Sequence, residues 1–359
     1  MPQIHADRRA LAQRKIAESG ADGALITIPA NVRYLSGLVS SNMAMLLPAD
    51  GPALLGTDFR YAETAERDCP DLDIEIERQL EPALVRLAAG RGWRTLAFEA
   101  HQLTVEQHSV LTALPDAPRL VPLGHLVEEL RAVKDESEIE LLARACALTD
   151  EAFAAVLGAI RPGRTERELA VAIERAMVDL GAEAPAFDTI IASGPNGAIP
   201  HHSPGSRVLQ RGDLVTIDCG ARHAGYHADM TRTVALGPPA PWQREIYDLV
   251  AAAQRAGVAA AVAGADVGEV DATARGMIAA AGHGDHFGHG LGHGVGLEVH
   301  EAPMLGPGRT GKLKDRVPVT VEPGIYLPGM GGVRIEDTLV VRAAGPETLI
   351  TTTRELLVL

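Results

Sequence analysis

The sequence has few cysteines, and they form no recognisable pattern. Its 359 residues include only Cys69, Cys146 and Cys219, an odd number spread over most of the chain. Such spacing fits neither a set of paired disulfides nor a CxxC metal motif. We therefore expect free thiols and a protein of the reducing cytoplasm, because disulfide frameworks belong mainly to oxidising compartments.

Basic residues and long apolar runs are also scarce. Lys and Arg number 33 against 47 Asp and Glu, which gives a formal net charge of −14. This balance argues against non-specific binding to nucleic acid phosphates or to anionic membranes. No stretch of about 18 apolar residues occurs, and the opening MPQIHADRRALAQRK has no apolar signal core. We expect no nucleic acid partner, no membrane partner and no targeting segment.

The length allows two domains, each with its own core. Up to about Leu123, helical stretches alternate with the short apolar runs GALITI, MAMLLP, LDIEI, TLAFEA and RLVPL. This alternation predicts an α/β unit, and it carries no cluster of titratable groups that would suggest an active site. We predict an N-terminal α/β domain over residues 1–128 and a second domain over residues 129–359.

The second domain begins with helices and continues with strands. Helical spacing predicts one helix from about Leu126 to Arg161, and Thr165 with Glu168 forms a capping box for a helix that Gly181 ends. A further helix is expected over residues 268–280. Apolar and β-branched residues bounded by Gly and Pro predict strands in an α+β arrangement. The predicted strands span residues 186–193, 213–220, 226–236, 317–327 and 332–342.

Carboxylates stand inside these apolar strands, where an unpaired charge is costly to bury. Side chains alternate between the two faces of a strand. The side chain of Asp218 therefore lies on one face of the strand LVTID, and that of Asp229 lies on one face of the strand HADMT. Their offset of 229 − 218 = 11 positions suits a hairpin that brings the two acids together. Glu322 in TVEPG and Glu336 in VRIED occupy similar positions. Converging acids repel one another, and a pair of divalent metal ions would neutralise them.

The segment GHGLGHGVGLEVHE, residues 288–301, is rich in histidine. His283, His286, His289 and His293 are spaced by three, three and four residues, so a helical turn could gather them into a zinc site. The many glycines favour instead an irregular backbone in which one histidine binds metal and others face a substrate. Oxygen donors with one imidazole and no thiolate suit Mn²⁺, Co²⁺ or Zn²⁺.

Five segments together resemble the pita-bread metallopeptidases: VKDESEIELLARA, IDCGARHAGYHADMTRT, HGLGHGVGLEVHE, TVEPGIY and VRIEDT. The resemblance is strongest to the proline-specific branch, the Xaa-Pro dipeptidases and aminopeptidases P. It implies a creatinase-like N-terminal domain, a pita-bread catalytic domain, a homodimer, and peptide substrates with proline at the second position. It also implies two divalent metal ions, most often manganese, with cobalt or zinc as alternatives.

The resemblance assigns a role to each site residue. Asp218 is expected to bind metal through both oxygens, Asp229 and Glu336 to bridge the ions, and His293 and Glu322 to be terminal ligands. It places His201, His289 and His300 on the substrate side, with Tyr326 and Arg334 near the proline pocket. On chemical grounds we expect His201, His300 and Glu322 to be catalytic, with His300 as the donor to the oxyanion and Glu322 as the carrier of the proton. Arg309 is expected to bind substrate as well, because an arginine between His300 and Glu322 can receive a substrate carboxylate.

Some assignments have alternatives within this chain. His202 could exchange roles with His201, and Arg316 could replace Arg309 as the group that receives a substrate carboxylate. The family usually has a glycine where this chain has Arg316, in LKDRVPVTVEPG. Cys219 stands beside Asp218, but strand alternation points it away from the ligand face, so we expect no catalytic thiol.

We therefore predict metal-dependent hydrolysis of the peptide bond before proline, most simply in dipeptides. The alternatives are an aminopeptidase P that acts on longer peptides, a methionine aminopeptidase, a metal-independent creatinase-like hydrolase, and an inactive pita-bread module that only binds peptides.

Overall fold

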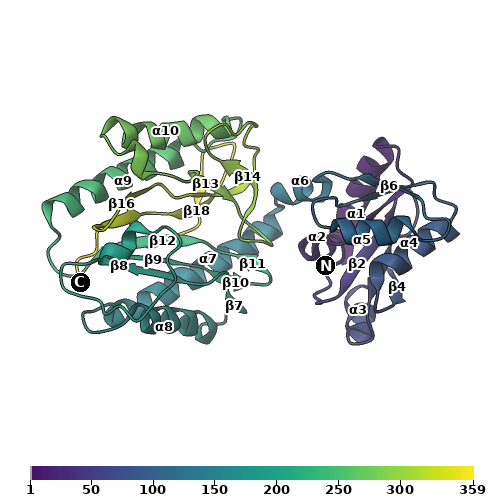
Figure 1. Ribbon diagram of the computed structural model, residues 1–359, viewed down its shortest axis with the longest axis horizontal. Helices are drawn as coiled ribbons and strands as arrows, with labels where there is room; N and C mark the ends of the chain where they lie inside the picture. The colour runs from purple at the N-terminus through teal and green to yellow at the C-terminus, as the bar shows by residue number, and fades with distance from the viewer. Residues whose placement is uncertain (1) are drawn as a thin grey trace. The chain divides into compact units, whose positions relative to one another are not determined.

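A computed structural model describes residues 2–359 of the chain. It divides into two compact units, the first ending at Arg131 and the second running from Ala132 to Leu359. The domain boundary predicted after residue 128 lies 131 − 128 = 3 residues before this division. Each unit has its own sheets and its own apolar core, and each is described by itself (Figure 1).

The first unit is an α/β unit built on one six-stranded sheet with the order β4-β3-β2-β1-β5-β6. Strands β1, β5 and β6 run parallel to one another, whereas β2 is antiparallel to both of its neighbours. Its elements are α1 (Pro2–Glu18), β1 (Gly23–Ile26), α2 (Pro29–Ser36), β2 (Met43–Pro48), β3 (Leu54–Thr57), α3 (Ala62–Asp68), β4 (Asp73–Ile76), α4 (Leu80–Gly90), β5 (Thr95–Phe98), α5 (Val105–Thr112) and β6 (Arg119–Pro122).

The five predicted apolar runs of the first unit form β1, β2 and β5 inside the sheet and β4 and β6 at its edges. Leu25, Leu46 and Leu96 come from β1, β2 and β5, and they pack with Leu84 of α4 in a fully buried cluster. The sequence patterns did not predict α2, β3 and α3. These elements are short, four to eight residues each, so they hold too few turns or alternations for a periodic pattern to stand out.

The second unit is larger and has an α+β composition. Its helices are α7 (Glu136–Val156), α8 (Glu166–Asp179), α9 (Pro241–Ala260) and α10 (Val267–Ala280), and α6 (Leu126–Ala132) precedes them at the division between the units. Its longer strands are β8 (Ile190–Ser193), β9 (Leu214–Cys219), β12 (Met230–Ala235), β14 (Glu301–Leu305), β15 (Pro318–Val321), β16 (Gly324–Leu327), β17 (Gly331–Arg334) and β18 (Asp337–Val340). The shorter strands are β7 (Ala184–Pro185), β10 (Ala221–His223), β11 (Tyr226–His227), β13 (Gly292–Gly294) and β19 (Glu347–Thr348).

Two predictions about the helices of this unit were wrong. The helix expected from Leu126 to Arg161 is broken after Ala132, and a new helix starts at Glu136. Asp135 ends the break because its side chain caps the amide of Glu138, and the Glu138 side chain caps the amide of Asp135 in return. Helix α9 was missed altogether, although Pro241 stands at its first position, where proline favours a helix start.

Other sequence predictions for this unit are confirmed. Thr165 and Glu168 form the expected capping box at the start of α8, and Gly181 follows that helix with a φ of 104°. The predicted strands 226–236, 317–327 and 332–342 are present, but each is divided in two. The interruptions contain Asp229, Glu322 and Glu336, so these acids lie between regular strands rather than within them.

The strands of the second unit lie between two layers of helices, α7 with α8 and α9 with α10 (Figure 1). One apolar core forms where α7 and α8 pack on β9 and β12, with Leu142, Ile173 and Ile217 fully buried. The other forms where α9 and α10 pack on β15 and β18, with Val250 and Val319 fully buried. The interrupted strand segments therefore lie between two rigid packed layers.

Arg316 has a φ of 64°, which is in the left-handed region that favours glycine. Residue 316 is also the position at which the family resemblance implies a glycine. We expect Arg316→Gly to raise the free energy of unfolding by up to about 1 kcal/mol, because relief of the left-handed strain exceeds the extra chain entropy of glycine. Denaturant unfolding would measure this. A variant less stable than the wild type would show that the arginine side chain outweighs the strain.

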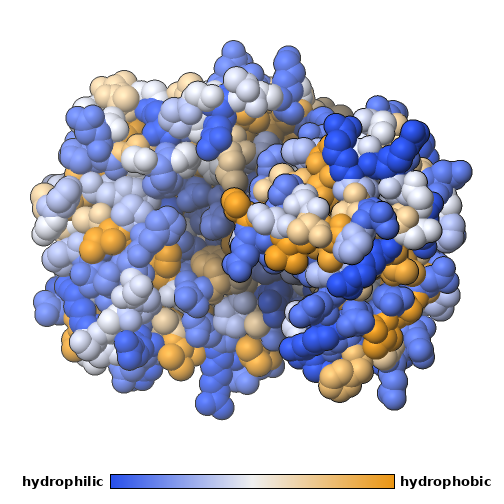
Figure 2. All heavy atoms as spheres, turned by 45° about the vertical axis from the view of Figure 1, so that its right-hand side comes forward, coloured by the Kyte–Doolittle hydropathy of each residue, from blue (hydrophilic) through white to orange (hydrophobic). Residues whose placement is uncertain are grey.

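Hydrophilic side chains cover most of the face shown in Figure 2, and apolar side chains occur there in small separate groups. Among residues 2–359, no helix is long and apolar enough to cross a membrane.

Candidate metal centre

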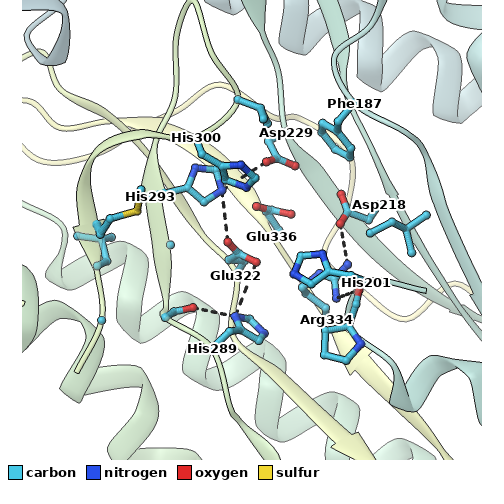
Figure 3. Close-up of a pocket in the computed structure, with 18 of the residues that line it drawn as sticks. Phe187, His201, Asp218, Asp229, His289, His293, His300, Glu322, Arg334 and Glu336 are labelled. Carbon is cyan, nitrogen blue, oxygen red and sulfur yellow. Dashed lines mark hydrogen bonds and ion pairs between the residues drawn. The ribbon is translucent and has the colours of Figure 1, made fainter. Parts of the chain in front are cut away.

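A cavity of about 590 Å³ lies in the second unit, and most of the predicted site residues line it. Figure 3 shows the acids and His293 directed into a common space between strand segments. The predicted site residues that line the cavity are His201, Asp218, Asp229, His289, His293, His300, Arg309, Glu322, Arg334 and Glu336. Tyr326 is not among the lining residues, and it lies behind them.

The imidazole of His293 stands among the acids. Its Nε2 atom is 3.6 Å from Oδ2 of Asp229 and 3.5 Å from Oε1 of Glu322. Ligand atoms of Asp229, His293 and Glu336 all lie within 4.8 Å of one another, and all three residues are buried. The Nδ1 atom of His293 is 2.9 Å from the carbonyl oxygen of Gly294. A proton on Nδ1 therefore donates to this carbonyl and leaves Nε2 free as a ligand atom.

Ionising all the acids of this cluster at once is unfavourable, because they are buried and close to one another. Burial, followed by the charges of Glu336 and Asp218, raises the pKa of Asp229 well above its ordinary value. Burial and the charge of Glu336 also raise the pKa of Glu322. Burial and the charge of Asp218 raise the pKa of Glu336 to about 8. A bound cation would remove this penalty, because it favours the ionised form of every neighbouring carboxylate.

Asp218 meets the one buried arginine of the cavity wall. Nη2 of Arg334 donates to Oδ2 of Asp218 over 2.6 Å, and Nε of Arg334 donates to Thr231. Oδ1 of Asp218 is buried and has no hydrogen-bond partner among the described residues. One arginine thus holds one oxygen of one carboxylate, and a second buried oxygen needs another positive or donor group.

Further contacts hold the acids in place. The hydroxyl of Thr231 donates to Oε2 of Glu336 over 2.7 Å, and the hydroxyl of Thr338 donates to the backbone carbonyl of Asp229 over 2.8 Å. In the β9–β12 pair, Thr231 lies opposite Asp218. These contacts orient the carboxylates in the way that outer-sphere partners orient metal ligands. The donor set, the orphaned oxygen and the raised pKa values fit a site for divalent cations.

His289 has both ring nitrogens in use. Its Nδ1 donates to the carbonyl of Gly290 over 2.8 Å, and its Nε2 lies 2.7 Å from the hydroxyl of Tyr326. Arg334 donates to the same hydroxyl over 3.0 Å. Burial and the positive charges of Arg334 and Arg275 outweigh the bond to Gly290 and lower the pKa of His289 to about 4. His289 is therefore a neutral ring with its orientation set by Tyr326.

The other predicted histidines differ in their freedom. His300 is exposed in the cavity. Its ring packs edge to face on the ring of His293, with 4.4 Å between the two ring centroids. His201 is also exposed in the cavity. His202, the alternative to His201, bonds through Nε2 to the fully buried Glu166 over 2.8 Å. This bond leaves His201 as the freer of the two histidines.

The remaining candidates are separated by the structure. Arg309 lines the cavity as an exposed side chain, and Arg316 is not among the lining residues. The four histidines considered as a zinc site do not form one cluster among the described residues. Nδ1 atoms of His283 and His286 lie 3.2 Å apart, whereas His289 and His293 face Tyr326 and the acids.

Some residues of the site were not predicted from the sequence. Phe187, Ile190 and Met304 add apolar surface to the cavity, and Figure 3 shows Phe187 near Asp218. No local pattern marks these three, because ordinary strand and loop residues of the same type occur throughout the chain. Strand alternation places Thr231 on the same face as Asp229, but it predicts no role for this threonine. Its position two residues after that acid was the one signal available for its contact with Glu336.

An α/β unit followed by an α+β unit with a buried centre of acids and histidine defines a two-domain metalloenzyme. Residues 140–343 match the model of metallopeptidase family M24, and residues 8–133 match the creatinase/prolidase N-terminal domain. The chain belongs to metallopeptidase family M24. This membership confirms the predicted resemblance, the fold class and the class of enzyme, and M24 metallopeptidases use divalent metal ions.

Three similar proteins illustrate the relationship. The chain is 47% identical to an Xaa-Pro dipeptidase of Pyrococcus furiosus, over 95% of this chain and 96% of the relative. It superposes on the structure of an Xaa-Pro dipeptidase from Bacillus anthracis with a TM-score of 0.94 and 38% identity, covering 99% and 100% of the two chains. An X-Pro aminopeptidase structure from Thermotoga maritima gives a TM-score of 0.89 and 36% identity, covering 96% of this chain and 97% of that one.

Proposed function

We propose that this protein is an Xaa-Pro dipeptidase, which hydrolyses the peptide bond before proline with the help of two divalent metal ions. The observation that carries the proposal is the convergence of Asp229, His293 and Glu336 within 4.8 Å in a cavity that Asp218 and Glu322 also line. The Xaa-Pro dipeptidases of Pyrococcus furiosus and Bacillus anthracis, which match nearly the whole chain, supply the substrate class.

Asp218, Asp229, His293, Glu322 and Glu336 would hold the ions, as the family resemblance implies. Manganese is the proposed metal, and cobalt and zinc are the alternatives that this donor set also suits. Two such ions, when bound, supply a water that is acidic enough to attack near neutral pH, and they polarise the carbonyl under attack.

The residues of the chain then perform the remaining tasks. A ring N–H of His300, which is free in the cavity, donates to the oxygen that gains negative charge during the attack. Glu322 accepts a proton from the attacking water and delivers it to the leaving nitrogen of proline. His201, which lines the cavity beside Arg334 (Figure 3), also donates to the substrate. His289 is neutral and held by Tyr326, so it offers ring surface rather than charge.

Selection for proline fits an apolar part of the cavity. The proline nitrogen carries no proton and its ring fixes φ, so a site for it must hold the ring instead of an N–H donor. Phe187, Ile190 and Met304 contribute apolar surface to the lining of the cavity. We propose that the pyrrolidine ring packs against this surface, with Arg334 holding the adjoining wall in place through Asp218.

Arg309 is the proposed partner of the free carboxylate of a dipeptide. It is an exposed cavity residue with a guanidinium that can pair with a carboxylate. We expect Arg309→Gln to raise the KM for an Xaa-Pro dipeptide about 10-fold, with kcat little changed. The effect is smaller than the loss of a buried ion pair would cause, because solvent screens an exposed pair. Steady-state kinetics would measure this. Arg316→Gln is the matched control, since Arg316 lies outside the cavity wall, and an equal effect of both variants would contradict the role of Arg309.

An aminopeptidase P that trims longer peptides is the second candidate, and the structural match to the Thermotoga maritima X-Pro aminopeptidase favours it. The deciding experiment compares Xaa-Pro dipeptides with tripeptides and longer Xaa-Pro peptides under Mn²⁺, Co²⁺ and Zn²⁺. Cleavage confined to dipeptides supports the proposal. Equal or better cleavage of longer peptides supports aminopeptidase P. Absence of cleavage and of metal binding supports an inactive peptide-binding module.

Two further expectations belong to this proposal. The three cysteines are free and buried, which supports a location in the reducing cytoplasm. Pairing of two copies is proposed from the family resemblance alone, and sedimentation equilibrium would test it.

A further inference from the structure

The first unit carries a second group of side chains of the types that bind metal ions, and this group plays no part in the proposed reaction. His101 stands between β5 and α5, His125 immediately precedes α6, and Glu128 lies in the first turn of α6. One ligand atom from each of the three residues lies within 4.8 Å of the other two. The rings of His101 and His125 lie 4.3 Å apart, and Nε2 of His101 is 2.8 Å from Oε1 of Glu128.

Glu128 is not satisfied by these contacts. Its Oε1 atom accepts from His101 and from the side-chain amide of Asn31, the latter over 3.0 Å. Its Oε2 atom is shielded from solvent and has no hydrogen-bond partner in the described part of the chain. A carboxylate oxygen in this state lacks the donor or cation that buried polar atoms almost always have.

A second acid, Glu99, meets Glu128 at Asn31, whose Oδ1 accepts from the buried Arg131 over 2.7 Å. Asn31 also donates to Oε1 of Glu99 over 2.6 Å, so one amide serves both carboxylates. Glu99 is 1% exposed, and burial is the main cause of its raised pKa, to which the charge of Glu128 contributes. A cation at Glu128 would reduce the repulsion between the two acids.

We propose that His101, His125 and Glu128 form a zinc site in the N-terminal unit, separate from the metal centre of the catalytic unit. Two imidazoles and one carboxylate are a common ligand set of Zn²⁺, and a water completes the tetrahedron at the exposed side. Zinc ligands lie about 2.0–2.2 Å from the ion, so the present separations require only side-chain adjustments. His101 binds through Nε2 once the ion replaces the proton shared with Glu128.

The position of the site gives it a structural consequence. His101 belongs to the segment after β5, and His125 with Glu128 belongs to the beginning of α6, more than twenty positions later. An ion between them fixes α6 to the end of the sheet. Zinc therefore stabilises the N-terminal unit at concentrations above its dissociation constant, because it binds the folded unit and not the unfolded chain.

The test measures zinc content directly, so it does not depend on peptidase activity. The full-length wild type, His101→Ala/His125→Ala, Glu128→Gln and the control His283→Ala/His286→Ala are equilibrated with buffered Zn²⁺, separated from free metal and analysed by mass spectrometry. The control removes another close pair of histidines, for which no carboxylate completes a site among the described residues. The expected result is one zinc ion fewer per chain in the two test variants than in the wild type and the control.

The experiment compares the zinc content per chain of each variant with that of the wild type. Zinc bound in the catalytic unit contributes equally to both and does not affect the difference. Glu128→Gln keeps the shape of the side chain, so it decides the question if the double variant does not fold. Equal zinc content in the wild type and Glu128→Gln would overturn the proposal. An equal loss in the His283/His286 control would overturn it as well, since any exposed histidine pair would then suffice. Failure of the proposed peptidase function would leave both results unchanged.

Discussion

Replacing Asp229 with asparagine should lower the kcat for Xaa-Pro dipeptides on the order of 10³-fold and reduce the metal content of the purified protein. Asp229 is 5% exposed and lies 3.6 Å from His293. Asparagine keeps the shape but removes the charge and replaces one oxygen with an amide that cannot bind a cation. A loss of several kcal/mol of metal-dependent stabilisation corresponds to a rate change of this size.

The control for Asp229→Asn is Asp188→Asn. Asp188 is an exposed acid that lines the same cavity but does not belong to the metal-ligand cluster. Mass spectrometry for bound metal and steady-state kinetics would be applied to both variants. Asp188→Asn should keep its metals and most of its activity. If Asp229→Asn retained full metal content and full activity, Asp229 would not be a ligand.

Replacing His300 with alanine should lower kcat about 10²–10³-fold and leave the metal content unchanged. Loss of a single donor to a developing oxyanion has an effect of about this size. His300 is exposed in the cavity and contacts the metal-site histidine His293 only ring to ring. Its removal therefore takes away a donor to the substrate without removing a ligand.

Kinetics and metal analysis on the same His300→Ala sample would separate these two roles. His283→Ala serves as the control, since His283 contacts His286 and does not line the cavity. Loss of the metals together with activity in His300→Ala would make His300 a ligand or a support of the ligands. Unchanged kcat would exclude the oxyanion role.

Local patterns in the sequence predicted the two units and marked the four acids, whereas the choice of His293 among the histidines came from the family resemblance. Strand alternation marked Asp218 as an acid on one face of an apolar strand, which forms as β9. The spacing of glycines around His289 and His293 argued against a helix, and His293 lies in the short strand β13. These inferences succeeded because each depends on residues close together in the chain.

Contacts between distant residues could not be predicted in the same way. Arg334 was expected to face the substrate, and its guanidinium is held by Asp218, Thr231 and Tyr326. Tyr326 was also expected near the substrate, and its hydroxyl instead bonds both His289 and Arg334. These bonds follow from the packing of separate strand pairs, which no local spacing encodes.

Two of the three breaks in the strands leave no mark in the sequence. Apolar and β-branched residues continue across Asp229 and Glu336, which predicts unbroken strands there, whereas Pro323-Gly324 directly after Glu322 is a turn signal that the predicted strand 317–327 passed over. In the structure, the chain passes from one sheet to another at these points. The turns place the acids at the ends of strands from different sheets, where they can converge on one space.

The most direct test of the metal centre is anomalous X-ray diffraction from crystals grown with Mn²⁺. The account predicts two manganese peaks about 3.5–4 Å apart in the cavity, bound by Asp218, Asp229, His293, Glu322 and Glu336. Manganese peaks away from these five side chains, or a cavity without manganese at saturating concentration, would contradict it.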